Sequence, residues 1–126
     1  MRGEELQRCA RERADELPGS ELEQPFGPEW DVYKVRGKVF LLMTGATGQP
    51  IVTVKVEPQD GAALRSTHDD VTPGYHMNKR HWITLRPGGS LTERLVRELV
   101  LESYLLVVEK LPRARRPVDP DRYGRE

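Results

Sequence analysis

The chain has 126 residues, a formal net charge of zero and one cysteine. A chain of this length folds as one domain and buries roughly two thirds of the surface that its unfolded form exposes. Hydrophobic residues make up 37% of the sequence and charged residues 32%, which excludes the disordered class. No apolar run approaches the ~20 residues of a membrane span, the N-terminus lacks the apolar segment of a signal peptide, and one cysteine excludes an internal disulfide. We therefore expect a cytoplasmic globular protein.

The charge is unevenly distributed along the chain. Residues 1–70 carry nine Lys and Arg against thirteen Asp and Glu, whereas residues 71–126 carry eleven against seven. Such asymmetry permits an anionic partner at one end. The sequence pI of about 6.8, however, lacks the strongly basic balance that is usual for dedicated nucleic-acid-binding domains. Any affinity for DNA must therefore come from a local patch.

The first predicted element is a helix over residues 2–17. Apolar residues recur at helical spacing from Leu6 to Leu17, and a Pro-Gly pair then stops the pattern. Because Cys9 falls on the apolar face, we expect a buried structural thiol and not a reactive one. A short edge strand follows, and it leads into a turn rich in proline and glycine around Phe26.

A β-meander is predicted next. Residues 31–35 and 38–43 are rich in β-branched and aromatic side chains, and the Arg-Gly pair between them indicates a two-residue hairpin. In that register Tyr33 faces Phe40 across the hairpin. Residues 51–56 alternate between valine and other residues, so they form a third strand with its valines turned inward.

The second half is predicted to hold a short helix, a strand and the longest helix. The short helix begins at Pro58, which suits a first helical turn, and the strand covers residues 82–86. The longest helix, over residues 95–111, follows a candidate N-cap at either Ser90 or Thr92. Its leucines and valines form adjoining stripes, so we expect it to lie across the sheet. The predicted fold class is α+β, with an antiparallel sheet flanked by N- and C-terminal helices.

We predict a single domain over residues 1–112. Residues 113–126 are basic, contain two prolines and show no apolar periodicity. A flexible C-terminal tail is therefore expected. The sequence has no internal repeat that would indicate a second domain.

The most distinctive segment is VTPGYHMNKRHWITL, residues 71–85. It places two cations beside two imidazoles and an indole, a combination that can neutralise phosphates and stack on bases. The hypothetical nucleic-acid contacts are Tyr75, His76, Asn78, Lys79, Arg80, His81 and Trp82, joined by Lys38 and Lys55 if these share the same face. Neutralising two to four phosphates implies a salt slope of only about −2 to −4, which is too little for tight DNA binding without further contacts. A tight bend is predicted near Asn78 and Lys79.

Two other interpretations of this segment stay open. In one, Lys79 and Arg80 form a solvated turn and Trp82 packs in the core, which leaves an interaction module without a site of its own. In the other, Tyr75, His76 and Trp82 wall a cleft for a small molecule. Further aromatic residues that could line such a cleft, or fill the core instead, are Phe26, Trp30 and Tyr33.

Reaction chemistry is not indicated by the sequence. His76 and His81 do not reproduce a zinc-binding HExxH spacing and have no third ligand nearby in sequence, so no metal is expected. The pair Asp69-Asp70 is predicted to be exposed, where a carboxyl group lacks the raised pKa of a general acid. Residues 44–48, TGATG, lack the pattern of a phosphate-binding loop, and no serine has a nucleophile-elbow context. We expect a non-enzymatic protein without a cofactor.

Three segments in order resemble signature blocks of the MmcQ/YjbR family. They are PFGPEWDVYKVRGKVF (25–40), TPGYHMNKRHWITL (72–85) and SYLLVVEKLP (103–112), of which PGYHMNKRHW is the most specific. The resemblance covers nearly the whole chain up to Pro112. It implies a fold similar to the CyaY/frataxin-type α+β arrangement and a proposed DNA-binding role through a double-wing surface in small bacterial proteins. The family's association with an antibiotic gene cluster also allows a resistance-type small-molecule binder.

Overall fold

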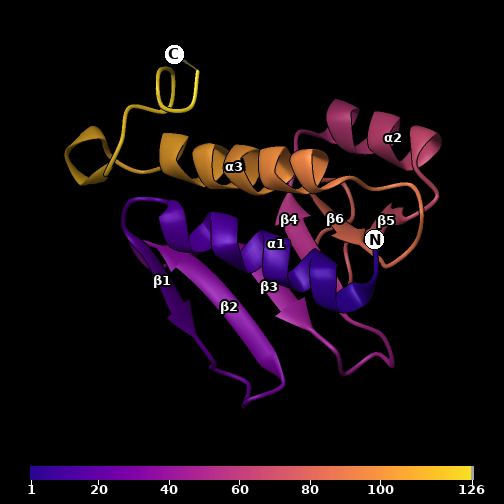
Figure 1. Ribbon diagram of the computed structural model, residues 1–126. Helices are drawn as coiled ribbons and strands as arrows, with labels where there is room; N and C mark the ends of the chain where they lie inside the picture. Colours follow the sequence, from indigo (N-terminus) through magenta and orange to yellow (C-terminus); the bar gives the residue numbers. More distant parts are fainter. Residues whose placement is uncertain (126) are drawn as a thin grey trace.

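The computed structural model describes residues 1–125. The elements in chain order are α1 (Gly3–Glu16), β1 (Ser20–Glu23), β2 (Trp30–Val35), β3 (Lys38–Thr44), β4 (Ile51–Lys55), α2 (Pro58–Thr67), β5 (Val71–Pro73), β6 (Trp82–Leu85), α3 (Glu93–Glu109) and the 3₁₀ helix η1 (Arg113–Arg115). The strands form one antiparallel sheet in the order β1-β2-β3-β4-β6-β5. Helices α1 and α3 lie side by side over one face of it (Figure 1). The predicted α+β fold with terminal helices flanking the sheet is confirmed.

The two long helices form where the sequence predicts them. In α1 the apolar stripe is buried, and Cys9 has no exposed surface. Burial raises the pKa of the Cys9 thiol, and the prediction of a buried cysteine is confirmed. Helix α3 begins after Thr92, whose hydroxyl accepts a hydrogen bond of 3.1 Å from the backbone N–H of Leu95. Thr92, and not Ser90, is therefore the N-cap.

The β2–β3 hairpin has the predicted two-residue turn but a different register. Arg36 and Gly37 both have positive φ, at 50° and 81°, as such turns require. Tyr33 pairs with Leu41 and not with Phe40, because a β-bulge lies between the Tyr33 and Lys34 pairings. The extra residue allows Phe40 and Leu41 both to be fully buried. The Tyr33–Phe40 pairing expected from the sequence was thus wrong by one residue.

A single serine joins α3 to this bulge. The Ser103 hydroxyl donates a hydrogen bond of 2.6 Å to the carbonyl of Phe40 and accepts one of 2.8 Å from the backbone N–H of Lys55. Ser103 has no exposed surface. Two backbone groups of different strands are thereby satisfied by one helical side chain, which fixes α3 across β3 and β4.

Residues 113–125, expected from the sequence as a flexible tail, fold back against α3 (Figure 1). The guanidinium of Arg116 donates to the carbonyls of Leu111 and Glu109, at 2.9 and 2.8 Å, where α3 leaves its last carbonyls free. Tyr123 packs with its ring centroid 6.3 Å from that of Tyr104. The residues that make these contacts show no helical or strand periodicity, so the sequence did not predict the contacts. Within residues 1–125, no helix combines the length and apolar character needed to cross a bilayer.

Candidate functional site

The face of the sheet that α1 and α3 leave uncovered carries a cavity of about 560 Å³, here called the aromatic pocket. Its floor is formed by Val32, Val39 and Leu42 of β2 and β3. The residues of its walls and rim are Pro25, Phe26, Trp30, Lys34, Tyr75, His76 and Met77. Strand alternation explains the floor, because these side chains point away from the helices while Tyr33, Leu41 and Met43 point toward them.

Aromatic rings dominate the pocket wall. The rings of Trp30 and Tyr75 are nearly parallel, with centroids 6.2 Å apart and an interplanar angle of 13°. Phe26 meets Trp30 edge-on at 6.3 Å. Phe26 and Tyr75 nevertheless remain 69% and 38% exposed. Large aromatic side chains that are held by neighbouring rings but remain exposed offer a stacking surface for a flat ligand.

The loop of residues 74–81 holds Tyr75 over the sheet. The backbone N–H of Tyr75 donates to the hydroxyl of Thr84, 2.8 Å away, and that hydroxyl also bonds to Thr53 at 2.9 Å. Gly74 is required here, since a Cβ on it would lie 2.7 Å from the Cβ of Trp82. Only glycine therefore lets the loop approach β6 this closely.

The predicted bend at Asn78 and Lys79 is confirmed. The Asn78 side-chain oxygen accepts hydrogen bonds from the backbone N–H groups of Arg80 and His81, at 2.9 and 3.3 Å. The Lys79 ammonium group donates to the carbonyl of Gly74, 3.0 Å away, and so closes the loop on itself. Lys79, one of the two cations of the NKR segment, is therefore already hydrogen-bonded within its own loop.

His76 has a backbone conformation that residues other than glycine rarely adopt. Its φ is 59°, in the left-handed region. Its ring lies 4.1 Å, centroid to centroid, from that of Tyr75 at the pocket wall. Residues held in sparsely populated backbone regions cluster at ligand-binding sites, where the surrounding structure maintains the strain. His76 therefore places a polar ring at the pocket wall.

The proposed nucleic-acid contacts line two different cavities. Tyr75 and His76 line the aromatic pocket, whereas four others line a separate hollow of about 300 Å³ beside the end of α3. These four are Lys55, Asn78, His81 and Trp82, and the acidic Glu57 and Glu109 line the same hollow. Lys38 and Arg80 are exposed outside both cavities.

Part of the aromatic pocket was predicted from the sequence, and part of it was not. Phe26, Trp30, Tyr75 and His76 were candidate cleft residues, but Trp82 lines the other hollow. Lys34 was missed, although it supplies the positive charge at the pocket wall and pairs with Glu23 at 3.1 Å. The available signal was that β2 and β3 are apolar on both faces, which indicates that something covers or occupies the second face.

Asp70 is not exposed, contrary to the prediction for the Asp69-Asp70 pair. It retains 9% of its surface, and its carboxylate accepts hydrogen bonds from the backbone N–H and the hydroxyl of Ser90, at 2.8 and 2.7 Å. These bonds to the ionised form, chiefly the one from the backbone, lower the pKa of Asp70. A general acid requires a raised pKa, so Asp70 serves to tie the β5 end to the segment before α3. Within residues 1–125 no three His, Cys, Asp or Glu side chains are grouped to share a metal ion.

Comparison with known proteins places this geometry in a family. The uncharacterized protein YbdF of Escherichia coli O157:H7 is 42% identical over 111 residues, which cover 88% of this chain and 91% of YbdF. YjbR of E. coli K12 is 35% identical over 101 residues, with coverage of 79% and 84%.

Two solved structures are similar over 84% of this chain. The Deinococcus radiodurans protein DR2400, with a DUF419 domain, has a TM-score of 0.77 at 37% identity, and 81% of it is covered. A Pseudomonas syringae protein has a TM-score of 0.65 at 25% identity, and 98% of it is covered. A family model described as YjbR matches residues 15–106. The chain belongs to the YjbR family.

Proposed function

We propose that this protein is a non-enzymatic binding protein whose aromatic pocket takes a small, planar and largely apolar molecule. The observation that carries the proposal is the cavity of about 560 Å³ with aromatic walls, an aliphatic floor and few polar groups. Ligand pockets usually enclose roughly 300–1,000 Å³ and have this composition. The strained backbone at His76 adds to the argument, because a ligand contact is a reason to maintain it.

The pocket chemistry defines the ligand class. A flat ring system stacks against Trp30 or Tyr75 and covers the floor at Leu42. Lys34 provides a cation for one anionic substituent, which would share the ammonium group with Glu23. We therefore propose an aromatic or heteroaromatic molecule with one carboxylate or similar anionic group.

The test is a screen of aromatic carboxylates by thermal shift and by Trp30 fluorescence, in a Trp82→Phe background that leaves one indole. A ligand present at 100 times its Kd stabilises the folded state by about 2.7 kcal/mol, which is a shift of several degrees. Tyr75→Ala and Phe26→Ala should abolish the response. Leu22→Ala removes a 50% exposed apolar side chain outside the pocket and should leave it intact. If no compound produces both responses, the proposal fails.

Nucleic acid is the second candidate. It is favoured by the exposed Arg80 and by the hollow beside the end of α3, which His81, Lys55, Trp82 and Lys110 line. It is limited by Glu57 and Glu109 in that hollow and by the Lys79 contact to Gly74. Arg80→Ala is the cleaner variant, because Lys79→Ala would also loosen the loop. It should weaken duplex binding equally across sequences and flatten the salt dependence. Absence of duplex and single-strand binding at low salt would eliminate this candidate.

A further inference from the structure

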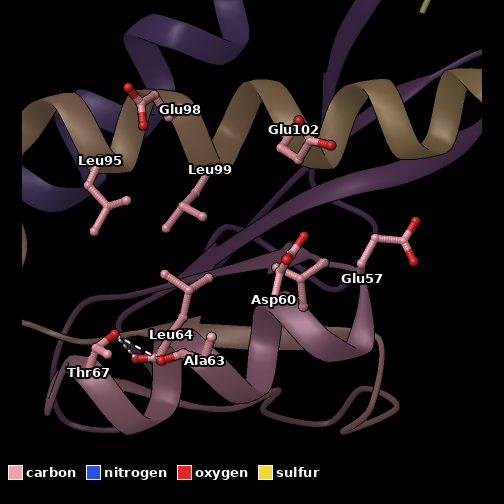
Figure 2. Close-up of a pocket in the computed structure, with 10 residues that line it drawn as sticks. Glu57, Asp60, Ala63, Leu64, Thr67, Leu95, Glu98, Leu99 and Glu102 are labelled. Carbon is pink, nitrogen blue, oxygen red and sulfur yellow. Dashed lines mark hydrogen bonds between the residues drawn. The ribbon is translucent and has the colours of Figure 1, made fainter. Parts of the chain in front are cut away.

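A second concave surface lies between α2 and α3, and it shares no residue with the aromatic pocket. We call it the helix groove; its volume is about 500 Å³. Leu64 of α2 points across it toward Leu95 and Leu99 of α3 (Figure 2). The gap is therefore lined with leucine but not closed by it.

The helix groove continues along α3. The hollow of about 300 Å³ beside the end of α3 shares Val56 and Glu57 with it and extends to Leu106 and Lys110. The leucines at positions 95, 99 and 106, one of the two stripes that the sequence predicts, thus follow one continuous track. At a rise of 1.5 Å per residue the track is about 16 Å long, which equals three turns of a helix.

Four carboxylates surround the leucines. They are Glu57, Asp60, Glu98 and Glu102, drawn as sticks in Figure 2. Glu98 pairs with Arg94 at 3.2 Å and Glu102 with Arg125 at 3.5 Å, both as exposed pairs of small energy. Within residues 1–125, Glu57 and Asp60 make no salt bridge. Their place at the start of α2 suits the helix dipole, but Glu98 and Glu102 lie inside α3, where the dipole offers no such reason.

We propose that the helix groove binds a basic amphipathic helical segment of a partner protein. The track is about three turns long, and its accessible apolar surface comes chiefly from Leu64 and Leu95, because Leu99 and Leu106 keep only 8% and 7% of their surface. Such a track accepts the i, i+3, i+4 and i+7 side chains of a helix. Around Leu95 and Leu99 the rim is acidic and complementary to Lys and Arg on the flanks of that helix, whereas Lys55 and Lys110 line the end near Leu106. The cations of the partner therefore belong to the half of its helix that lies beside α2. A second copy of this chain is a poorer occupant, because the apolar faces of α1 and α3 are already buried against the sheet.

Helix α2 offers a matched pair of variants. Ala63 lines the groove and Ala62 does not, although both are exposed on the same helix. Ala63→Arg places a long cationic side chain in the groove and partly neutralises its rim. Ala62→Arg makes the same chemical change and the same change in net charge outside the groove. Neither variant removes a buried side chain, so both should fold.

The experiment measures fluorescence anisotropy of a labelled leucine-lysine peptide of about 16 residues with leucines at helical spacing. The wild type should bind it, Ala62→Arg should bind within about twofold, and Ala63→Arg should bind at least about tenfold more weakly. Raising the salt should weaken wild-type binding. Equal affinities of the two variants, or equal binding of a leucine-glutamate peptide, would overturn the proposal. So would a wild-type dimer in sedimentation that Ala63→Arg makes monomeric, since the groove would then serve self-association.

Discussion

The two faces of the sheet differ in how closely they are packed. The helix-covered face is filled by side chains from every layer, with fully buried Leu6, Leu41, Val54 and Tyr104 and the Ser103 bonds that join α3 to the strands. On the opposite face, the loops around Phe26 and Tyr75 border a cavity. Helices have period 3.6 and fill a face with close-packed side chains, whereas loops leave gaps.

The difference separates stability from function along the same strands. Alternate residues of β2 and β3 face the core and the aromatic pocket. Of two neighbouring positions, one therefore contributes to packing in the core and the other to the surface of the pocket. A substitution on the helix-covered face should cost folding free energy. One on the loop-covered face should cost less folding free energy and should also change binding.

The sharpest test of that separation is the pair Leu41→Ala and Leu42→Ala. Leu41 is fully buried under the helices, so its truncation should reduce the free energy of unfolding by about 3–4 kcal/mol. Leu42 lies on the pocket floor, where the existing cavity reduces the loss to about 2 kcal/mol. Urea denaturation of both variants provides the measurement. Equal losses would show that the two faces are equally packed.

Ser103→Ala tests whether the contact between α3 and the bulge matters. It leaves the Phe40 carbonyl and the Lys55 N–H without their partner in a buried place, at a cost of about 2 kcal/mol. The matched control is Ser66→Ala, because Ser66 is exposed and bonds only to a carbonyl of its own helix. Denaturation curves that coincide for the two variants would contradict the role assigned to Ser103.

Asp70→Asn should reduce the free energy of unfolding by about 1–2 kcal/mol at pH 7, because it removes the charge that strengthens the two hydrogen bonds from Ser90. The pKa of Asp70 is lowered in the folded state, so its contribution is fully present above the unfolded pKa and is lost as pH falls through the folded pKa. The stability difference between wild type and variant should therefore vanish toward acid pH. The control is Asp69→Asn, because Asp69 is the exposed neighbour. Its thermal melts should match those of the wild type at every pH.

The smallest expected effect is at His76. Glycine at this positive φ relieves backbone strain but adds entropy to the unfolded chain, so His76→Gly should raise stability by only about 0.5 kcal/mol. Ligand binding to the aromatic pocket should weaken at the same time. Arg36→Gly, at a φ of 50° in the hairpin, should gain less stability, because it also removes the 3.1 Å hydrogen bond from the Arg36 guanidinium to the Arg115 carbonyl, and it should leave binding unchanged. A loss of stability in His76→Gly would mean that its side chain contributes more than the strain costs.

Local patterns predicted the elements well. The alternation of residues 51–56, the cap region before α3 and the Arg36-Gly37 turn depend on neighbours within a few positions, and all three appear in the structure. The short strand β5 was missed, since three residues ending in proline carry no periodicity. Its pairing with β6 is decided by the fold around it.

The candidate site was only half predictable. Tyr75 and His76 were identified because the residue types are distinctive, but nothing local indicates that the chain turns between them and Trp82 into a different cavity. Nor does the sequence show that the Lys79 ammonium group donates a hydrogen bond to the Gly74 carbonyl of its own loop. Residue type indicates what chemistry is available, while loop closure decides where it is placed.

By itself, the sequence determined the α+β class, the burial of Cys9 and the helical frame, because periodicity and capping act over a few residues. The tertiary structure alone decided the bulge register, the docking of residues 113–125, the aromatic pocket and the helix groove. These depend on contacts between residues far apart in the chain, such as Ser103 with Phe40, 63 positions away. Such contacts form only when the whole sheet and its helices have assembled, and no local pattern records them.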